Sequence, residues 1–495
     1  MYRCYVPREE GCWAPAVHSN CIHNEVAALG LRTMGPTPSD PPDFGKPGTL
    51  VGDYFKGLRI LVKRLNVEKM TLAQVASSYK GKLGVRYREA KESLDEEWLR
   101  RRDCKLTAFI KGEKFDPGLK VSKPRIINPR SPRYNLVLAS YLKPLEHALW
   151  ANWKVGNMCR QSRVSGKGLN SRQRAELIQA KMDDVGDCMV VEVDGKAFEA
   201  HVTRAQLLLE QTVYKAAFKS RELRWLLEFQ LGLAGRTSGG IKYSRDGCRA
   251  SGDFNTGLGN TLLMGSFTIC AMQALNIPAP WTVLADGDNC LLFFRREWLG
   301  VVESRFGATL SGICGHEMTI EKPVDCLEKV VFGQSSPVRI GEELQMVRNP
   351  YKVLSGAFCG YLHYHEPAFA PRLMKAVADA EASLSKGLPV LGPYFQAARR
   401  ILAPYKNLRK PEEFLEGHLL HVKLSPEPSQ ITIETRVSFE RAFGIDVDEQ
   451  IAMEARLVAS LEAELPSVLS EARWLRSSVE VTHGKGPGHH DNTMV

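Results

Sequence analysis

The sequence predicts a fold of mixed helices and strands that is divided into two or three lobes. The chain has 495 residues, more than one hydrophobic core normally organises. Its apolar and charged fractions, 44% and 25%, are those of an ordinary globular protein. Short β-rich runs lie in the middle of the chain, and the pattern after Pro350 is helical almost to the end. These observations argue against wholesale disorder.

The N-terminal part predicts an extended lead-in, basic helices and a strand-rich segment. Residues 1–50 are rich in turn formers, and residues 51–104 carry helical patterns with many Lys and Arg. Residues 105–135 are basic and strand-like, because their prolines oppose a helix. Further helices are expected from about residue 136 to 153 and over residues 172–183.

The middle of the chain predicts a strand, helices and a hairpin. A short β-rich run, CMVVEVD, ends on Asp194, and helices dominate residues 203–232. The stretch 254–285 has no charged residue and is long enough for a membrane span. Its prolines and amides instead favour a buried helix, a loop and a strand. In WTVLADGDNCLLFF, two apolar runs flank Gly287 and Asp288, which predicts a β-hairpin.

The C-terminal part predicts helices and a disordered end. The amphipathic run DEQIAMEARLVASLEAELPSVLSEARWL is expected to be interrupted at Pro466. The tail 477–495 has no apolar period and is expected to be disordered. The N-terminus lacks an apolar signal-peptide core, and no transmembrane segment is expected.

Charge and cysteine content narrow the function classes without choosing one. The formal net charge of +10 and the pI of about 8.9 suit a polyanionic partner, such as nucleic acid or an anionic membrane surface. A basic charge that serves only solubility fits equally well. The twelve cysteines show no zinc spacing, so reduced thiols are the default. For the isolated pair His363 and His365, a surface or packing role is favoured over a metal site.

Two aspartates at strand ends are candidate metal ligands. Asp288 lies at the tip of the predicted hairpin, where a carboxylate is exposed while its flanks are anchored in a core. Asp194 ends a short apolar strand, so the two carboxylates could share a pair of Mg²⁺ ions, as phosphoryl transfer requires. Taken alone, each aspartate is more simply a turn residue. An EF-hand is excluded because Cys290 stands where the next oxygen ligand belongs.

The segment SGDFNTGLGNTLLMG places polar side chains at the start of a predicted helix. Ser251 and Gly252 permit a tight turn, and Asp253 is expected to cap the helix. Thr256 and Asn260 are four residues apart and share one helix face, where they could bind a sugar edge. Helix capping with buried polar residues explains the same pattern equally well.

A basic segment precedes these motifs. KLTAFIKGEKFDPGLKVSKPRIINPRSPRYN contains eight Lys and Arg residues in a turn-rich context. On strands, such residues could line a channel for a nucleoside triphosphate. A solvated basic loop is the simpler alternative.

The order of the four segments resembles motifs F, A, B and C of positive-strand RNA virus polymerases. The basic segment comes first, then the Asp194 strand, the Ser-Gly helix and the Gly-Asp hairpin. The sequence is similar to the tombusvirus group and is closest in pattern to the umbra-like viruses of fungi. The resemblance covers about residues 17–355. It includes HSNCIHNEVAALGLR, KPRIINPRSPRYN, YLKPLEHALW, GKGLNSRQRAELI, DGKAFEAHV, SGDFNTGLGNTLLM, GDNCLLFF and VVFGQSSPVRIGEELQMVRNP.

The resemblance implies a role for each candidate residue. Asp194 and Asp288 match the catalytic, metal-binding aspartates. The residues implied to lie over the triphosphate are Lys111, Lys114 and Arg125. The residues implied to check the ribose and orient the template are Ser251, Thr256 and Asn260.

Two positions depart from the usual motifs of that family. Glu199 stands where the family has a second Asp, and its extra methylene changes its reach toward the ribose 2′-hydroxyl of the nucleotide. Asn289 stands in place of the last Asp of Gly-Asp-Asp, as it does in the umbra-like group. Asn keeps an oxygen but loses a charge, so we expect Asn289 to join the metal ligands and to tune rather than abolish metal binding.

The same resemblance implies an α+β right-hand polymerase with fingers, an antiparallel palm sheet and a helical thumb. The implied parts are an N-terminal extension with fingers (1–185), palm (186–204), a fingers insertion (205–250), palm (251–344), thumb (345–476) and the tail (477–495). The implied activity is RNA-dependent RNA polymerisation, which replicates a positive-strand viral genome by two-metal nucleotidyl transfer.

Cofactor, partners and location follow from the resemblance as well. Mg²⁺ is expected, with Mn²⁺ as a substitute. The expected partners are RNA template and product strand and ribonucleoside triphosphates, with other viral replication proteins as candidates. The expected location is the host cytoplasm, with membrane-associated replication complexes as a candidate. Two other classes stay open: an inactive relative that only binds RNA, motivated by Glu199 and Asn289, and a reverse transcriptase, against which the SG-x-x-x-T-x-x-x-N helix argues.

Overall fold

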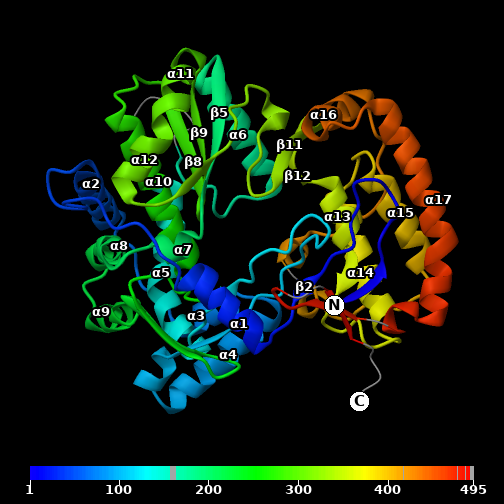
Figure 1. Ribbon diagram of the computed structural model, residues 1–495, viewed down its shortest axis with the longest axis horizontal. Coiled ribbons are helices and arrows are strands. Elements are labelled where there is room, and N and C mark those ends of the chain that lie inside the picture. Colours follow the sequence, from blue (N-terminus) through cyan, green and yellow to red (C-terminus); the bar gives the residue numbers. More distant parts are fainter. Residues whose placement is uncertain (156–162, 416, 477, 485–486, 491–495) are drawn as a thin grey trace.

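The chain folds into two lobes around separate hydrophobic cores (Figure 1). This computed structural model describes residues 1–155, 163–415, 417–476, 478–484 and 487–490. The larger lobe contains two four-stranded sheets and the helices that cover them, whereas the smaller lobe is mainly helical. The expectation of a mixed helix-and-strand fold is confirmed.

The helices of the larger lobe agree with the periodic segments of the sequence. They are α1 (Ile22–Ala28), the π-helical turn η1 (Leu29–Thr33), α2 (Leu50–Leu65), α3 (Leu72–Ser77), α4 (Gly81–Glu96), α5 (Pro132–Asn152), α6 (Ser171–Val185), α7 (Phe198–His201), α8 (Arg204–Ala217), α9 (Arg221–Glu228), α10 (Thr256–Ala274), α11 (Leu299–Val301) and α12 (Gly307–Cys314). The helices expected over residues 136–153, 172–183 and 203–232 are confirmed.

The central sheet of the larger lobe is antiparallel, with the strand order β10-β5-β9-β8. Its strands are β5 (Cys188–Gly195), β8 (Trp281–Asp286), β9 (Asn289–Arg295) and β10 (Met318–Ile320). The expected hairpin is therefore present. A second sheet, β4-β3-β6-β7, consists of β3 (Leu106–Ile110), β4 (Ile126–Ile127), β6 (Gly232–Thr237) and β7 (Lys242–Asp246).

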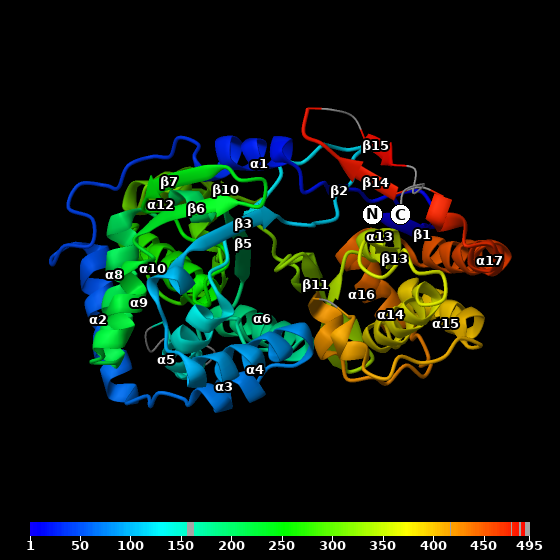
Figure 2. The same cartoon turned by 90° about the horizontal axis from the view of Figure 1, so that it is seen from below.

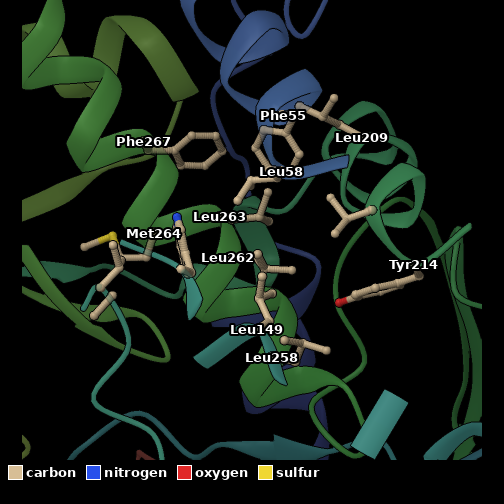
Figure 3. Packing of buried hydrophobic residues seen from close by; sticks show 14 of the residues in the cluster. Phe55, Leu58, Leu149, Leu209, Tyr214, Leu258, Leu262, Leu263, Met264 and Phe267 are labelled. Carbon is tan, nitrogen blue, oxygen red and sulfur yellow. The ribbon is translucent and has the colours of Figure 1, made fainter. Parts of the chain in front are cut away.

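Helix α10 is the centre of the larger core. Its apolar side chains, Leu263 and Phe267 among them, lie against Phe55 and Leu58 of α2 (Figure 3). Nearly every residue of α10 is buried, which explains why the stretch 254–285 carries no charge. Over the described part of the chain, no helix is both long and apolar enough to cross a membrane.

The smaller lobe packs five helices against short strands. Its elements are β1 (Tyr2–Tyr5), β11 (Ser335–Ile340), β12 (Glu343–Arg348), α13 (Pro350–Gly356), β13 (Phe358–Gly360), α14 (Ala370–Leu384), α15 (Leu391–Leu402), α16 (Ile433–Phe443) and α17 (Val447–Glu471). The expected interruption at Pro466 is wrong, because α17 continues through it. Pro466 lies on the exposed side, while Leu461, Leu465 and Leu469 pack the opposite face into the core.

The expected disordered tail is wrong where the structure describes it. β14 (Ser478–Val481) pairs in parallel with β2 (Val17–His18) and in antiparallel fashion with β15 (Pro487–His490). Figure 2 shows β14 and β2 near the N-terminus. The partner of β14 comes from the opposite end of the chain, so no local pattern could reveal it. Residues 477, 485–486 and 491–495 of the expected tail lie outside the described residues.

The two chain ends hold the loop between β3 and β4. Val481 is fully buried and packs with Ala16 and Phe115. Ala16 and Phe115 also exchange two backbone hydrogen bonds of 3.0 Å. Because β1 pairs with β13, the same N-terminal segment is anchored in the smaller lobe. The terminal segments therefore connect that lobe to the basic loop.

We predict that Val481→Asp destabilises this junction, because it buries a charge without a partner, which typically costs roughly 3 kcal/mol or more. The change should lower the thermal unfolding temperature and speed proteolysis of residues 111–125. Glu480→Gln, on the other face of β14, is the matched control and should stay within about 0.5 kcal/mol of the parent. Equal stability of the two variants would contradict a holding role for β14.

Candidate active site

The central sheet brings Asp194 and Asp288 to one edge. Asp194 lies opposite Asn289 in the pairing of β5 with β9. The backbone N–H of Gly195 donates to the carbonyl oxygen of Asp288 at 3.2 Å. Gly287 turns the hairpin at φ +69°, where a side chain would be strained, and its N–H donates to a hydroxyl on α10 at 2.9 Å. The strand end and the hairpin tip are therefore fixed to each other and to the core helix.

The carboxylates at this edge repel one another. Burial raises the pKa of Asp288 to about 6, and the negative charges of Glu199 and Asp194 add to the rise, while Arg125 opposes it. Burial also raises the pKa of Asp194, and Glu199 adds to this rise too, again against Arg125. A cation at this edge would relieve the repulsion and favour the ionised carboxylates.

The two carboxylates can supply part of the ligand set of a divalent metal ion. Within the described ranges, no three His, Cys, Asp or Glu side chains converge closely enough to hold a metal ion by themselves. Mg²⁺ commonly keeps several waters and takes one or two carboxylates plus substrate phosphates. Asp194 and Asp288 supply two such carboxylates at one edge, where burial, and then the charges of Glu199 and Asp194, raise the pKa of Asp288.

Asp286, the other acidic residue of the hairpin, is already neutralised. Its carboxylate forms ion pairs with Lys167 at 2.5 Å and Arg174 at 2.6 Å. Burial would raise the pKa of Asp286, but these two cations hold the pKa below its ordinary value. Asp286 therefore anchors the hairpin to α6 and to the residues just before it. The sequence motif alone did not indicate this role.

Asn289 is fixed by a carboxylate of the neighbouring strand. Its side-chain nitrogen donates to Glu192 at 2.5 Å. Its Oδ1 atom is buried and has no hydrogen-bond partner in the described part of the chain. An asparagine at this position thus satisfies Glu192 with its N–H and leaves a neutral oxygen beside Asp194, where an aspartate would oppose Glu192 with a second negative charge.

Of the polar residues expected at the start of α10, Asn260 contacts Glu199, whereas Ser251 and Thr256 bond to backbone carbonyl groups. Asn260 donates to the Glu199 carboxylate at 3.5 Å, and its own Oδ1 is buried without a partner among the described residues. Ser251 donates to the backbone of Ile126 at 3.1 Å, and the Thr256 hydroxyl donates to carbonyl groups of the turn at 2.9 Å. Thr256 and Asn260 share a helix face, as expected.

The expected capping role of Asp253 is wrong. The residue preceding α10 is Asn255, whose side chain makes no capping hydrogen bond. Asp253 instead accepts from the Nε atom of buried Arg130 at 2.8 Å. A guanidinium buried beside a carboxylate must be paired, and this need overrides the local capping preference.

A second buried ion pair supports the same turn. Arg249 and Glu210 form a salt bridge with almost no solvent exposure, and Asn255 donates to Glu210 at 3.3 Å. Buried ion pairs therefore hold the chain on both sides of Ser251: Arg249 pairs with Glu210, and Asp253 pairs with Arg130.

Two of the three expected triphosphate residues line a pocket beside the aspartates. The pocket has a volume of about 220 Å³ and includes Lys111, Arg125, Glu199, Ser251 and Thr256. Lys111 and Arg125 both form ion pairs with Glu113, that of Arg125 at 3.3 Å. The pocket therefore combines cations at one side with the Glu199 carboxylate at the other.

Lys114 lies elsewhere. Its ammonium donates to the carbonyl oxygen of Gly356 at 2.7 Å, and it lines a larger pocket of about 570 Å³ against α13 and α14. Neither pocket is lined by Asp194 or Asp288, but Arg125 and Glu199 of the smaller pocket both shift the pKa values of these aspartates. Because metal-dependent chemistry needs charged ligands, the carboxylate cluster identifies the candidate active site better than pocket size does.

Arg32 is a pocket residue that the motif analysis did not single out. It lies on η1 and lines the 220 Å³ pocket with Lys111 and Arg125. It belongs to the segment HSNCIHNEVAALGLR, whose resemblance to polymerases was the available indication.

Comparison with known proteins places the chain in a family. A family model described as viral RNA-dependent RNA polymerase matches residues 16–464, and the chain belongs to this family. It is 32% identical over 463 residues to the RNA-directed RNA polymerase of Turnip crinkle virus, covering 88% of this chain and 57% of the relative. For the polymerase of Tobacco necrosis virus (strain A), identity is 32% over 391 residues, covering 78% and 53% of the two chains.

The similarity extends to a third viral polymerase and is partial in length. The polymerase of Groundnut rosette virus (strain MC1) is 30% identical over 452 residues, covering 88% of this chain and 52% of the relative. The resemblance to the tombusvirus group is confirmed, while the umbra-like branch stays a prediction. The chain spans about half the length of these curated relatives.

We predict that Glu210→Gln destabilises the larger lobe, because it leaves the Arg249 charge buried and uncompensated. Breaking such a buried pair typically costs roughly 3–5 kcal/mol. Glu222→Gln is the matched control, since the Glu222–Lys69 pair is partly exposed and should contribute about 1 kcal/mol or less. Urea unfolding measures the free energy of unfolding of both variants. An equal loss in the two variants would show that the buried Arg249–Glu210 pair stabilises the fold no more than the partly exposed pair does.

Proposed function

We propose that the chain is an RNA-dependent RNA polymerase that replicates the positive-strand genome of a tombusvirus-like virus, with the umbra-like viruses of fungi as the nearest group. The observation that carries this proposal is the meeting of Asp194 and Asp288 at one sheet edge, beside a basic pocket, in a chain of the viral polymerase family.

The proposed layout is a right hand. The central antiparallel sheet is the palm, from residues 186–204 and 251–344, and the mainly helical segment 345–476 is the thumb. Residues 1–185 and 205–250 supply the fingers, with the N-terminal extension reaching the thumb through β1. In this layout the candidate site lies at the turn between two palm strands, and the fingers provide its basic side.

The proposed reaction joins a ribonucleotide to the end of an RNA strand. The 3′-hydroxyl oxygen attacks the α-phosphate of the incoming triphosphate, and pyrophosphate leaves. Asp194 and Asp288 would hold Mg²⁺, or Mn²⁺ in its place, with the Oδ1 atom of Asn289 as a neutral oxygen at the same edge. When bound, two such ions stabilise charge on the attacking and leaving oxygens.

The other residues would bind the nucleotide. Lys111 and Arg125 face the same pocket as Glu199 and can exchange their Glu113 contacts for phosphate oxygens. The pairing of Asn260 with Glu199 leaves the Asn260 Oδ1 atom without a partner in the described ranges, so it can accept a hydrogen bond from a ribose hydroxyl. Ser251 and Thr256 hold the turn that orients the template. Lys114, bound to Gly356, is proposed to act only after that contact opens.

The proposed partners follow from this chemistry. They are an RNA template, the product strand and the four ribonucleoside triphosphates, with other viral replication proteins as further candidates. A net charge of +10 suits the phosphate backbone of RNA. The host cytoplasm, at membrane-associated replication complexes, is the proposed location.

We predict that Asp194→Asn and Asp288→Asn each reduce template-directed incorporation below roughly one hundredth of the parent rate, because loss of even a residue outside the metal ligands typically costs 10–100-fold. RNA binding should persist, since these carboxylates act on metal ions and not on the template. Labelled ribonucleotide incorporation and RNA titration measure the two effects.

The matched control is Asp187→Asn, because Asp187 precedes the same strand but is exposed and paired with Arg296. It should incorporate nucleotides at the parent rate. Substantial incorporation by Asp194→Asn or Asp288→Asn in Mg²⁺ would refute the two-metal assignment.

We predict that Asn289→Asp lowers incorporation by roughly tenfold, in the range seen for residues that orient metal ligands. The introduced carboxylate would face Glu192, which now accepts a hydrogen bond at that position. Burial already raises the pKa of Glu192, with the charge of Asp194 adding to the rise. The double variant Asn289→Asp/Glu192→Gln restores a donor between the two strands and should recover most of the rate.

Metal titrations test the ligand role of Asn289 separately. The neutral oxygen of Asn289 should hold Mg²⁺ less firmly than a carboxylate, so Mn²⁺ should stimulate the parent more than the double variant. If the dependence on both metals is the same in the two proteins, position 289 does not sense the ions and has no metal role.

A further inference from the structure

Arg32 presents a charged group to the candidate active site without a protein partner. It lies on η1 and lines the 220 Å³ pocket with Lys111, Arg125 and Glu199. Among the residues that the structure describes, its guanidinium makes no hydrogen bond and no salt bridge. Arg32 is nevertheless partly buried, so its guanidinium loses hydrogen bonds to water that no described protein group replaces.

The surroundings of Arg32 favour an anion. Burial lowers the pKa of Arg32, and the like charge of Arg125 lowers it further, while Glu199, Glu113 and Asp288 act in the opposite direction. Two guanidinium groups that repel each other at one pocket are both stabilised when an anion lies between them. The five donors of a guanidinium suit the oxygens of a phosphate group.

The fold holds Arg32 rigidly at this place. Arg245 of β7 donates to the carbonyl oxygens of Thr33 and Gly35, the latter at 3.2 Å. At the other end of the same helical unit, Glu25 accepts from the hydroxyl of Ser238 at 2.6 Å. Figure 2 shows α1 lying along the sheet that carries these partners. Arg32 is therefore positioned by a helical unit that hydrogen bonds fix at both ends. π-helical turns such as η1 are frequent at functional sites.

The size of the pocket indicates which part of a ligand it takes. Sites that enclose a whole small molecule usually measure roughly 300–1,000 Å³. The pocket at Arg32, about 220 Å³, is smaller, and Arg32, Lys111 and Arg125 are among the residues that line it. It suits part of a nucleotide, and the guanidinium of Arg32 suits the phosphate chain.

We propose that Arg32 binds the phosphate chain of the incoming ribonucleoside triphosphate, together with Lys111 and Arg125. This inference rests on the proposed polymerase function. It adds to the site a residue from the N-terminal helix, outside the basic segment between β3 and β4. The phosphate of an RNA backbone is the competing anion, and the test distinguishes the two.

The test compares Arg32→Gln and Arg32→Lys with the parent chain. Arg32→Gln should raise the KM for each ribonucleoside triphosphate by roughly tenfold or more, as expected for one lost charge-assisted contact. Arg32→Lys keeps the charge but not the planar fork, so its KM should lie between the two. RNA affinity and its dependence on salt should not change. Arg473→Gln, at an exposed pair with Glu471, is the control for loss of one charge.

Direct binding keeps this test independent of catalysis. Calorimetric titration of a ribonucleoside triphosphate in Mg²⁺ should give a weaker Kd for Arg32→Gln and for Arg32→Lys than for the parent. An unchanged KM and Kd in both variants would overturn the inference, and so would weaker RNA binding with a smaller salt slope, which would assign Arg32 to the RNA backbone. A parent chain that binds the nucleotide through Arg32 but incorporates none would overturn the proposed function and leave this inference standing.

Discussion

The register of β5 against β9 is the constraint on which the candidate site depends. A shift of one residue would move every side chain of β5 to the other face of the sheet. Both faces are buried: Val191 and Val193 pack into the core around α10, whereas Val190 packs on the side of α6. With two cores specifying the same register, Asp194 has one position, and the hydrogen bond from the next residue fixes Asp288 beside it.

The second step is the sorting of charge around that edge. Asp286 is neutralised by two cations, and the carboxylate of Glu192 is satisfied by Asn289. Asp194 and Asp288 have no such partner for their charge among the described residues, and burial, together with the negative charges of Glu199 and Asp194, raises the pKa of Asp288 to about 6. Hydrogen bonds and ion pairs within the protein thus stabilise the carboxylates of Asp286 and Glu192, whereas those of Asp194 and Asp288 can bind a ligand.

Patterns along the chain predict the parts whose contacts are local. The hairpin at Asp288 and the buried helix α10 follow from apolar runs, turn residues and the absence of charge. Contacts between distant segments could not be predicted in this way. The strand β14 forms because it pairs with β2 near the other end of the chain. The position of Asp253 is set by its ion pair with buried Arg130, and Arg32 lines a pocket that exists only after folding. For Lys114, the motif gave a role, but the contact with Gly356 depends on the other lobe.

The acidic and basic sides of the site are held in place by contacts of different extent. The acidic side is part of a sheet packed between two large cores. The basic loop carrying Lys111 and Arg125 is joined to the chain ends through a small cluster around Val481 and through the Ala16–Phe115 backbone pair. Segments with few buried contacts open at lower free energy than core strands. The carboxylate edge is therefore the fixed reference, and the basic side is the part that can adjust when a charged ligand arrives.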